Sequence, residues 1–217
     1  MLLLAVDTAT PAVTVALHDG SSVLAAERRT DARRHGELLL PAVDRVLARA
    51  GRKLDDVTEV IVGVGPGPYT GLRVGLVTAL TFGSALGVPV RGLCTLDGLA
   101  YASGLTEPFV VATDARRKEV YWARYADART RLTEPAVDRP ADLAEQVADL
   151  PVVGAGALLY PDVFPDARAP EHQSAEALAA LAAERLAAGG EFLAPLPLYL
   201  RRPDAQVPKN YKVVTPK

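Results

Sequence analysis

Two segments of the chain follow the same plan, and this repetition constrains the fold more than any other feature. Residues 2–17 contain an apolar run that ends at Asp7, a turn, and a second run with alternating β-branched residues. Residues 109–125 repeat this order, with an apolar run ending at Asp114, the turn ARRK and a returning run. Such runs, bounded by turn signals, are typical of β-strands. The repetition indicates a duplicated domain in which each copy starts from a strand, turn and strand.

Between the two units the hydrophobic period lengthens to three and four residues, as in an amphipathic helix. This period runs from Gly36, the expected N-cap, to about Ala50, where Gly51 follows as a stop signal. A short apolar run at 60–64 then leads through GPGPYTG into a second predicted helix, residues 70–86. Strands that alternate with helices favour an α/β fold.

The second half continues with the same kinds of element. Residues 139–150 have a helical pattern, and Ser174 is an expected N-cap for an Ala-rich helix. We therefore predict two α/β domains, 1–100 and 101–200, each a mixed sheet with flanking helices. A basic tail, 201–217, has no hydrophobic period and is expected to be mobile.

Composition excludes several classes of protein. With 49% hydrophobic and 23% charged residues the chain is expected to fold, and a net charge of −2 disfavours a stand-alone nucleic-acid binder. The single cysteine, Cys94, fits a reducing compartment. The uncharged stretch at 74–90 is short and rich in small and polar residues, so we predict a buried helix, no membrane span, and a cytoplasmic protein.

Asp7 and Thr8 end the first predicted strand, at the sheet edge where α/β proteins commonly bind ligands. An Asp in the first hairpin handles metal and phosphate in actin-like ATPases and sugar kinases. The plainer alternative, which we favour, is an Asx turn that shapes the hairpin.

The motif GPGPYTGLR, starting at Gly65, is the densest signal in the chain. Glycines before a helix can expose backbone N–H groups to an anion. The motif nevertheless lacks the Lys-Ser/Thr of a phosphate-binding P-loop, and Pro66 and Pro68 remove two donors. By itself it predicts a tight strand-to-helix connection capped by Thr70. Gly65, Gly67 and Thr70 join Asp7 and Thr8 as candidates for a position near a nucleotide.

Small residues recur every four positions in the second predicted helix, at Gly75, Ala79, Gly83 and Gly87. Such a stripe lets another backbone approach closely. Packing on the chain's own sheet and contact with a partner helix both remain open at this point.

The common catalytic and metal-binding patterns are not supported. A metal site at His35 would need a second ligand one turn later, but that position is Leu39. The chain also has no Gly-x-Ser-x-Gly elbow.

Five segments, in this order and spacing, resemble the TsaB (YeaZ) family, over about residues 1–202. They are LLLAVDTATPAVTVAL, RRHGELLLP, GVGPGPYTGLRVGLVTAL, TDARRKEVY and PLYLRR. The resemblance implies an actin-like (ASKHA, ribonuclease H-like) fold. It also implies the function of a non-catalytic subunit of the bacterial tRNA threonylcarbamoyladenosine machinery.

In that family, the chain would bind and activate the TsaD-type transferase, which modifies the adenosine next to the anticodon. A TsaE-type ATPase would join the complex, tRNA would be reached indirectly, and the chain alone would form a homodimer. TsaD carries a metal-binding His-x-x-x-His, and the matching positions here are Thr95 and Leu99. We therefore expect no metal site, no catalysis by the isolated chain, and no cofactor bound by it alone. An ATP or ADP site in the complex stays open.

The resemblance also assigns the partner interface to the two predicted N-terminal helices, which favours the partner-helix alternative for the small-residue stripe. The period alone leaves open which side chains face the partner. The candidate interface residues are Leu38, Leu39, Val43, Val46, Leu47, Leu72, Gly75, Leu76, Ala79, Leu80 and Gly83.

Two other functions remain as alternatives. One is an enzyme of the actin-like superfamily, either an ATP-dependent phosphotransferase that uses Asp7 and Asp114 or a metallopeptidase. The other is a homodimeric scaffold with a different partner.

Overall fold

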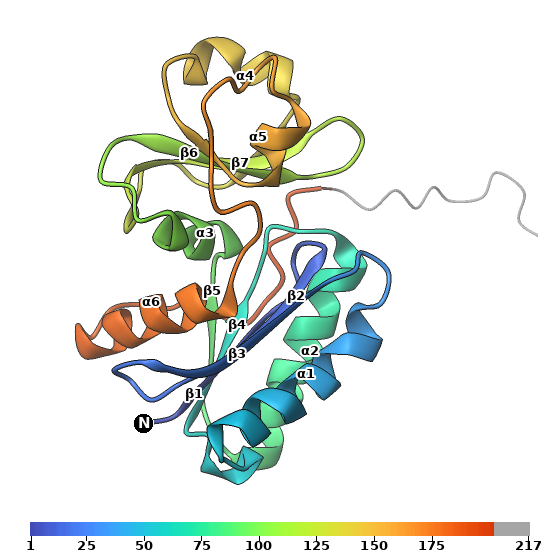
Figure 1. Cartoon of the computed structure of the whole chain (residues 1–217), viewed down its shortest axis with the longest axis vertical. Coiled ribbons are helices and arrows are strands. Elements are labelled where there is room, and N and C mark those ends of the chain that lie inside the picture. Colours follow the sequence, from blue (N-terminus) through green and yellow to red (C-terminus); the bar gives the residue numbers. More distant parts are fainter. Residues whose placement is uncertain (202–217) are drawn as a thin grey trace, which may run out of the picture.

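The computed structural model describes residues 1–201 and consists of two lobes, each built on one mixed sheet (Figure 1). The predicted architecture of two mixed sheets with flanking helices is confirmed. The basic tail predicted at 201–217 lies, apart from Arg201, outside the described residues.

The first sheet has the strand order β3-β2-β1-β4-β5. Strands β1, β2 and β3 pair antiparallel, whereas β4 and β5 continue the sheet in parallel with β1. The bounds are β1 (Leu3–Asp7), β2 (Ala12–His18), β3 (Val23–Thr30), β4 (Glu59–Gly63) and β5 (Val90–Leu93).

Three helices cover this sheet. Helices α1 (His35–Ala50) and α2 (Tyr69–Leu86) pack on one face, where Leu39 and Leu72 meet Val6 in a common apolar core. A single 3-10 turn, Leu54–Asp56, follows α1. The other face is covered by α6 (Ala175–Ala187), which comes from the second half of the sequence and returns to the first sheet (Figure 1).

The second sheet has the order β11-β10-β6-β7-β8, and β9 pairs with β7. Its hairpin β6–β7 and parallel strand β10 repeat the arrangement of β1, β2 and β4. The bounds are β6 (Phe109–Asp114), β7 (Val120–Asp127), β8 (Thr130–Arg131), β9 (Ala136–Asp138), β10 (Val152–Val153) and β11 (Ala167–Arg168). Its helices are α3 (Thr95–Ser103), α4 (Pro140–Val147) and α5 (Ala155–Leu159).

Helix α3 joins the lobes. Its residues Leu96 and Leu99 pack against Phe109 and Tyr125 of the second sheet, and α3 also lies against α6. Cys94, which precedes α3, is fully buried, and burial raises the pKa of its thiol to about 12. No helix within residues 1–201 combines the length and the apolar character needed to cross a membrane.

Several predicted helix ends differ from those observed. Gly36 is not the N-cap of α1, because the helix starts at His35 and Arg34 takes that position. Thr70 is not the cap of α2 either, because the Leu72 N–H already donates to the Pro68 carbonyl at 3.1 Å. The prediction of Ser174 as an N-cap is confirmed, since its Oγ accepts from the Ala177 N–H at 3.3 Å.

Candidate functional site

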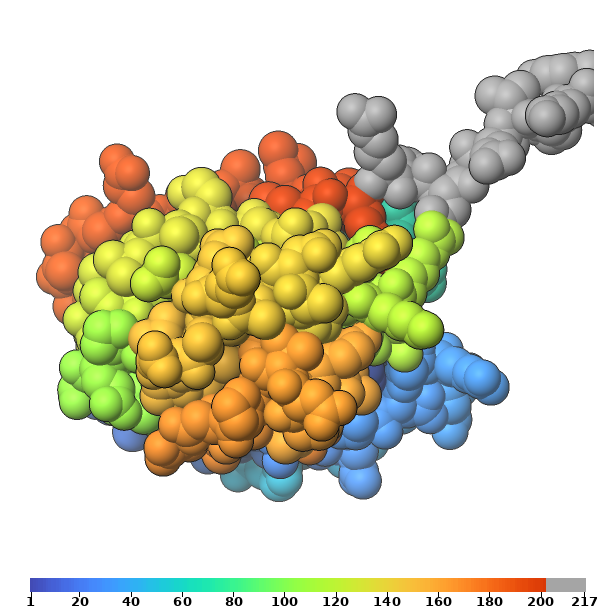
Figure 2. Space-filling view, turned by 90° about the horizontal axis from the view of Figure 1, so that it is seen from above, coloured from blue at the N-terminus to red at the C-terminus, as the bar shows by residue number. Residues whose placement is uncertain are grey.

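A cleft of about 280 Å³ lies between the two lobes. Four connections meet there: the β1–β2 turn, the segment before α1, the first turn of α2, and the β6–β7 turn. Figure 2 shows the lime-green β6–β7 turn and the blue segment before α1 projecting at the same side of the molecule. The lining residues are Thr8, Thr10, Pro11, Ala32, Arg33, His35, Gly36, Pro68, Tyr69, Thr70, Gly71, Val74, Asp114 and Arg116.

Asp7 is buried at the end of β1 and is not among the residues that line this cleft. Its Oδ1 accepts from the Ala9 N–H at 2.8 Å, which is the Asx turn favoured from the sequence. Its Oδ2 accepts from the Thr95 hydroxyl at 2.8 Å. Burial raises the pKa of Asp7 to about 6, although these hydrogen bonds act in the opposite direction.

The approach of β4 to this carboxylate requires glycine. A Cβ on Gly63 would lie 2.0 Å from Asp7 Oδ2, closer than any real contact. The carboxylate is therefore enclosed by Gly63, Thr95 and its own turn.

Thr8 connects the β1–β2 turn to α2. Its hydroxyl donates to the Gly71 carbonyl at 2.7 Å and accepts from the Gly75 N–H at 2.9 Å. A Cβ on Gly75 would lie 2.6 Å from Thr8 Oγ1. The small-residue stripe thus permits close packing inside the lobe.

The GPGPYTGLR motif packs beneath the β1–β2 turn. A Cβ on Gly67 would lie 2.2 Å from the Ala9 carbonyl oxygen, and the Gly65 N–H donates to Thr95 Oγ1 at 3.2 Å. Of the five candidates for a position near a nucleotide, Thr8 and Thr70 line the cleft, whereas Asp7, Gly65 and Gly67 do not.

The cleft contains polar residues that no single sequence motif brings together. His35 Nε2 lies 2.8 Å from the Thr10 carbonyl, and the Thr10 hydroxyl donates to Gln173 Oε1. Asp114 Oδ1 accepts from the Arg116 N–H at 2.7 Å. Asp114 is recognisable from the sequence as the counterpart of Asp7 in the repeated unit, but no local pattern links His35 with Thr10.

Thr95 and Leu99, the positions that the resemblance matches to metal ligands, do not fit a metal ion. Leu99 has no donor atom, and Thr95 Oγ1 is already bonded to Asp7 and to the Gly65 N–H. Within residues 1–201, no three His, Cys, Asp or Glu side chains lie together in a way that could hold a metal.

Most candidate interface residues lie in the core of the first lobe. Leu80 is 43% exposed and Leu38 is half-buried. The side chains that α1 and α2 present to solvent include Leu40, Val77 and Leu80. The partner interface remains a prediction, but these outward residues are the ones available for it. The buried candidates are Leu39, Val43, Val46, Leu47, Leu72, Gly75, Leu76, Ala79 and Gly83.

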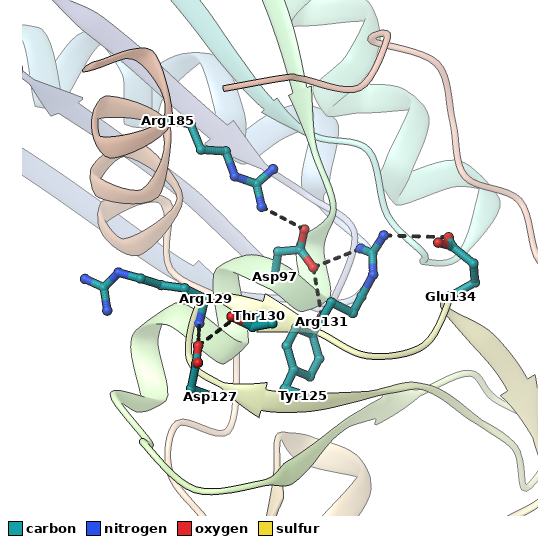
Figure 3. A network of polar contacts seen from close by, with 8 residues as sticks. All are labelled: Asp97, Tyr125, Asp127, Arg129, Thr130, Arg131, Glu134 and Arg185. Carbon is teal, nitrogen blue, oxygen red and sulfur yellow. Dashed lines mark hydrogen bonds and ion pairs between the residues drawn. The ribbon is translucent and has the colours of Figure 1, made fainter. Parts of the chain in front are cut away.

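A second polar cluster, centred on Asp97 of α3, connects the two lobes (Figure 3). The Asp97 carboxylate accepts from the Tyr125 hydroxyl at 2.9 Å, pairs with Arg131 at 2.9 Å and pairs with Arg185 of α6 at 3.3 Å. These partners come from β7, β8 and α6, so Asp97 holds three elements together. Arg129 adds a bidentate pair with Glu184 of α6.

Comparisons with known proteins agree with one another. The family model described as tRNA N6-adenosine threonylcarbamoyltransferase (TsaD) matches residues 28–209. Rv3421c from Mycobacterium tuberculosis is 44% identical over 217 residues, which cover 94% of this chain and 93% of that protein. The Escherichia coli tRNA threonylcarbamoyladenosine biosynthesis protein TsaB is 35% identical over 178 residues, or 75% of each chain. Among solved structures, YeaZ from Pseudomonas aeruginosa superposes with a TM-score of 0.80 at 32% identity, over 92% of this chain and 99% of that one.

Proposed function

This chain belongs to the TsaB (YeaZ) family, and on that premise we propose that it is a non-catalytic subunit that binds and activates a TsaD-type transferase. Family membership gives the chain a role in the biosynthesis of tRNA threonylcarbamoyladenosine. The activated reaction is transfer of the threonylcarbamoyl group to the adenosine next to the anticodon, in the cytoplasm.

The observation that supports a partner subunit over an enzyme is the state of Asp7. An active-site carboxylate has to reach a metal, a phosphate or a nucleophile, whereas both oxygens of Asp7 are bonded inside the fold. Thr95, which the resemblance matches to the first metal ligand of TsaD, is a hydroxyl residue bonded to Asp7.

The outer face of α2 supports the partner interface. Val77 is 61% exposed and lies three residues before Leu80, so both project from one side of the helix. An exposed apolar helix face beside a second helix, α1, suits a partner that supplies helices of its own. The same face would form a homodimer when the transferase is absent, and a TsaE-type ATPase would join the assembled complex.

Any nucleotide belongs, in this proposal, to the complex. Thr8 and Thr70 line the cleft, but the Thr8 hydroxyl is already bonded to α2 at both its donor and acceptor positions. The Thr8 hydroxyl is therefore not available to ATP or ADP in the isolated chain.

The direct test is transfer of labelled threonine to tRNA by TsaC-, TsaD- and TsaE-type proteins, with this chain present or omitted. Loss of product on omission is expected. Undiminished product would overturn the proposed role, and the isolated chain would then be tested for ATP turnover.

Variants of the outer face of α2 test the interface separately. Val77→Asp combined with Leu80→Asp is expected to abolish binding to the transferase, because a partner cannot bury two carboxylates without counter-charges. Leu158→Asp, which alters an exposed leucine of the second lobe, serves as the control. Equal binding by all three proteins would exclude this face, and a homodimer that the transferase does not dissociate would favour the scaffold alternative.

A further inference from the structure

The β6–β7 turn has an unusual backbone. Arg116, Arg117 and Lys118 have φ values of 62°, 53° and 61°, in the left-handed region that favours glycine. All three are exposed, and the turn is closed by the Glu119 N–H donating to the Arg116 carbonyl at 3.0 Å. Left-handed backbone at three successive non-glycine residues is strained, and such strain is concentrated at functional sites. All three side chains in this strained turn are basic.

The opposite lip of the cleft is basic as well. Arg33 lines the cleft together with Arg116. Nearby acidic groups balance part of this charge, because Asp114 pairs with Arg116 and Glu37 pairs with Arg34. Arg33 and Lys118 form no ion pair within residues 1–201. Arg33 at one lip, and Lys118 in the exposed β6–β7 turn that supplies Arg116 to the other lip, therefore remain for an anionic ligand.

A pair of exposed aromatic rings lies at the same edge. Tyr69, which lines the cleft, stacks on Tyr199 with ring centroids 5.2 Å apart and an interplanar angle of 22°. The two residues are 49% and 37% exposed. The Arg73 guanidinium lies 4.1 Å from the Tyr69 centroid, and its Nε–H donates to the Tyr199 hydroxyl at 3.1 Å. The rings are thus held in place and still present area to solvent.

Residues 200 and 201 connect the aromatic pair to the basic turn. Arg201 donates to the Ala115 carbonyl and pairs with Glu119, at the two ends of the β6–β7 turn. Residues 199–201 therefore run from the stacked rings to the basic turn. We call Arg33, Tyr69, Arg73, Lys118 and Tyr199 the rim surface.

We propose that the rim surface binds a single-stranded segment of RNA, with phosphates on Arg33 and Lys118 and an unpaired base on the tyrosine pair. Basic residues that follow a backbone, next to aromatic rings that stack with bases, are the shared design of proteins that bind single strands. The identity of the RNA, an anticodon loop, rests on the proposed function. Because the net charge of the chain is −2, the RNA contact depends on a local group of cations and not on the charge of the whole chain. This contact adds to the binding of RNA by the complex.

The test uses the full chain, alone and with a TsaD-type transferase, and an anticodon stem-loop RNA that carries 4-thiouridine in the loop. Ultraviolet cross-linking followed by peptide mapping is expected to place adducts at Tyr69 or Tyr199. Adducts only elsewhere, or none in either sample, would overturn the proposal. Protection of Tyr199 by the transferase with no effect of RNA would assign the rim surface to the protein interface instead.

Charge variants measure the binding of phosphates. Arg33→Gln with Lys118→Gln is expected to weaken RNA binding and to reduce the slope of log affinity against log salt by about 0.7 for each phosphate that is no longer neutralised. The matched control, Arg52→Gln with Lys53→Gln, removes the same charge beside the 3-10 turn after α1. Equal weakening in the two proteins would show a general charge effect and contradict the rim surface.

Aromatic variants measure stacking. Tyr199→Ala is expected to lower affinity roughly tenfold, whereas Tyr199→Phe keeps most of it because the ring is retained. These RNA-binding measurements require no threonine transfer, so they test the rim surface separately from the proposed function. If the chain binds RNA but threonine transfer does not depend on the chain, only the proposed function is refuted. If transfer depends on the chain but the rim surface does not bind RNA, only the rim-surface proposal is refuted.

Discussion

The Thr95 hydroxyl donates to Asp7 Oδ2 over 2.8 Å and thereby joins the end of β1 to the start of α3. Because the Gly65 N–H donates to the same hydroxyl, a single side chain links three segments of the chain. A carboxylate at a strand end, where actin-like enzymes handle phosphate and metal, is here part of the internal structure.

Removing this hydroxyl should weaken the fold. Thr95→Val keeps the shape but leaves a buried carboxylate oxygen and a buried N–H without their partner, so we expect a loss of about 1–3 kcal/mol in the free energy of unfolding. Urea denaturation measures it. Thr81→Val, whose hydroxyl bonds only within its own helix on the surface, should change stability by less than about 0.5 kcal/mol. Equal effects in the two variants would contradict the role of Thr95.

The pKa of Asp7 makes a prediction about pH. Folding raises this pKa from 3.8 to about 6, so the folded state keeps the proton where the unfolded state has lost it. The associated stabilisation is complete below pH 4 and is lost as pH rises through 6, by about 3 kcal/mol in total. Asp7→Asn removes this titration. The stability of the wild type relative to the variant should therefore fall from pH 4 to pH 7 in urea titrations, and parallel curves would refute the assignment.

Two Gly→Ala changes should have opposite effects. Gly63→Ala places a methyl group against Asp7 Oδ2 and should destabilise by at least about 2 kcal/mol. Gly36 lies in α1 with open space around its Cβ position, so Gly36→Ala should stabilise by roughly 0.5–1 kcal/mol. Thermal unfolding of the two variants provides the comparison, and destabilisation by both would count against the placement of Gly36 inside the helix.

Asp97 should be essential for the contact between the lobes. Asp97→Ala leaves Arg131, Arg185 and the Tyr125 hydroxyl without their common partner, and we expect a loss of about 3 kcal/mol. Glu134→Ala removes a carboxylate that is 92% exposed and only 3.6 Å from Arg131, so its effect should stay below about 0.5 kcal/mol. The proposal of a shared anchor fails if chemical denaturation shows similar effects for the two.

The left-handed turn should gain stability when a basic residue becomes glycine. Lys118→Gly relieves a φ of 61° and should stabilise by about 1 kcal/mol, while RNA binding by the rim surface becomes weaker. Calorimetry on the wild type and the variant checks the first effect. A destabilised variant would show that the Lys118 side chain, and not the backbone, determines the conformation.

The sequence predicted local structure better than contacts between distant segments. The hairpin at Asp7, its repeat at Asp114 and the cap at Ser174 could all be found because the signals lie within a few residues. The bond between Asp7 and Thr95 could not, because the two residues are far apart in sequence and neither local pattern specifies the other.

The helix faces show a second limit. Leucines such as Leu39 and Leu72 have the same spacing whether they face a sheet or a partner, so the period identified an apolar face without its neighbour. Only the position of α2 on the sheet distinguishes the outward residues Val77 and Leu80 from the buried residues of the same helix. Helix α3 has no clear local signal in the sequence, because Thr95 and Gly98 are weak helix formers in a short segment whose stability comes from packing.

The return of α6 to the first sheet affects synthesis of the protein. While the ribosome is still translating the second lobe, the face of the first sheet that carries Leu3, Ala5 and Ile61 has no helix to cover it. That face is closed only after Ala187 has left the exit tunnel, so the amino-terminal lobe cannot complete its fold during translation ahead of the rest. A nascent chain arrested before α6 has left the tunnel should consequently be a substrate for chaperones, whereas one arrested after α6 has emerged should not.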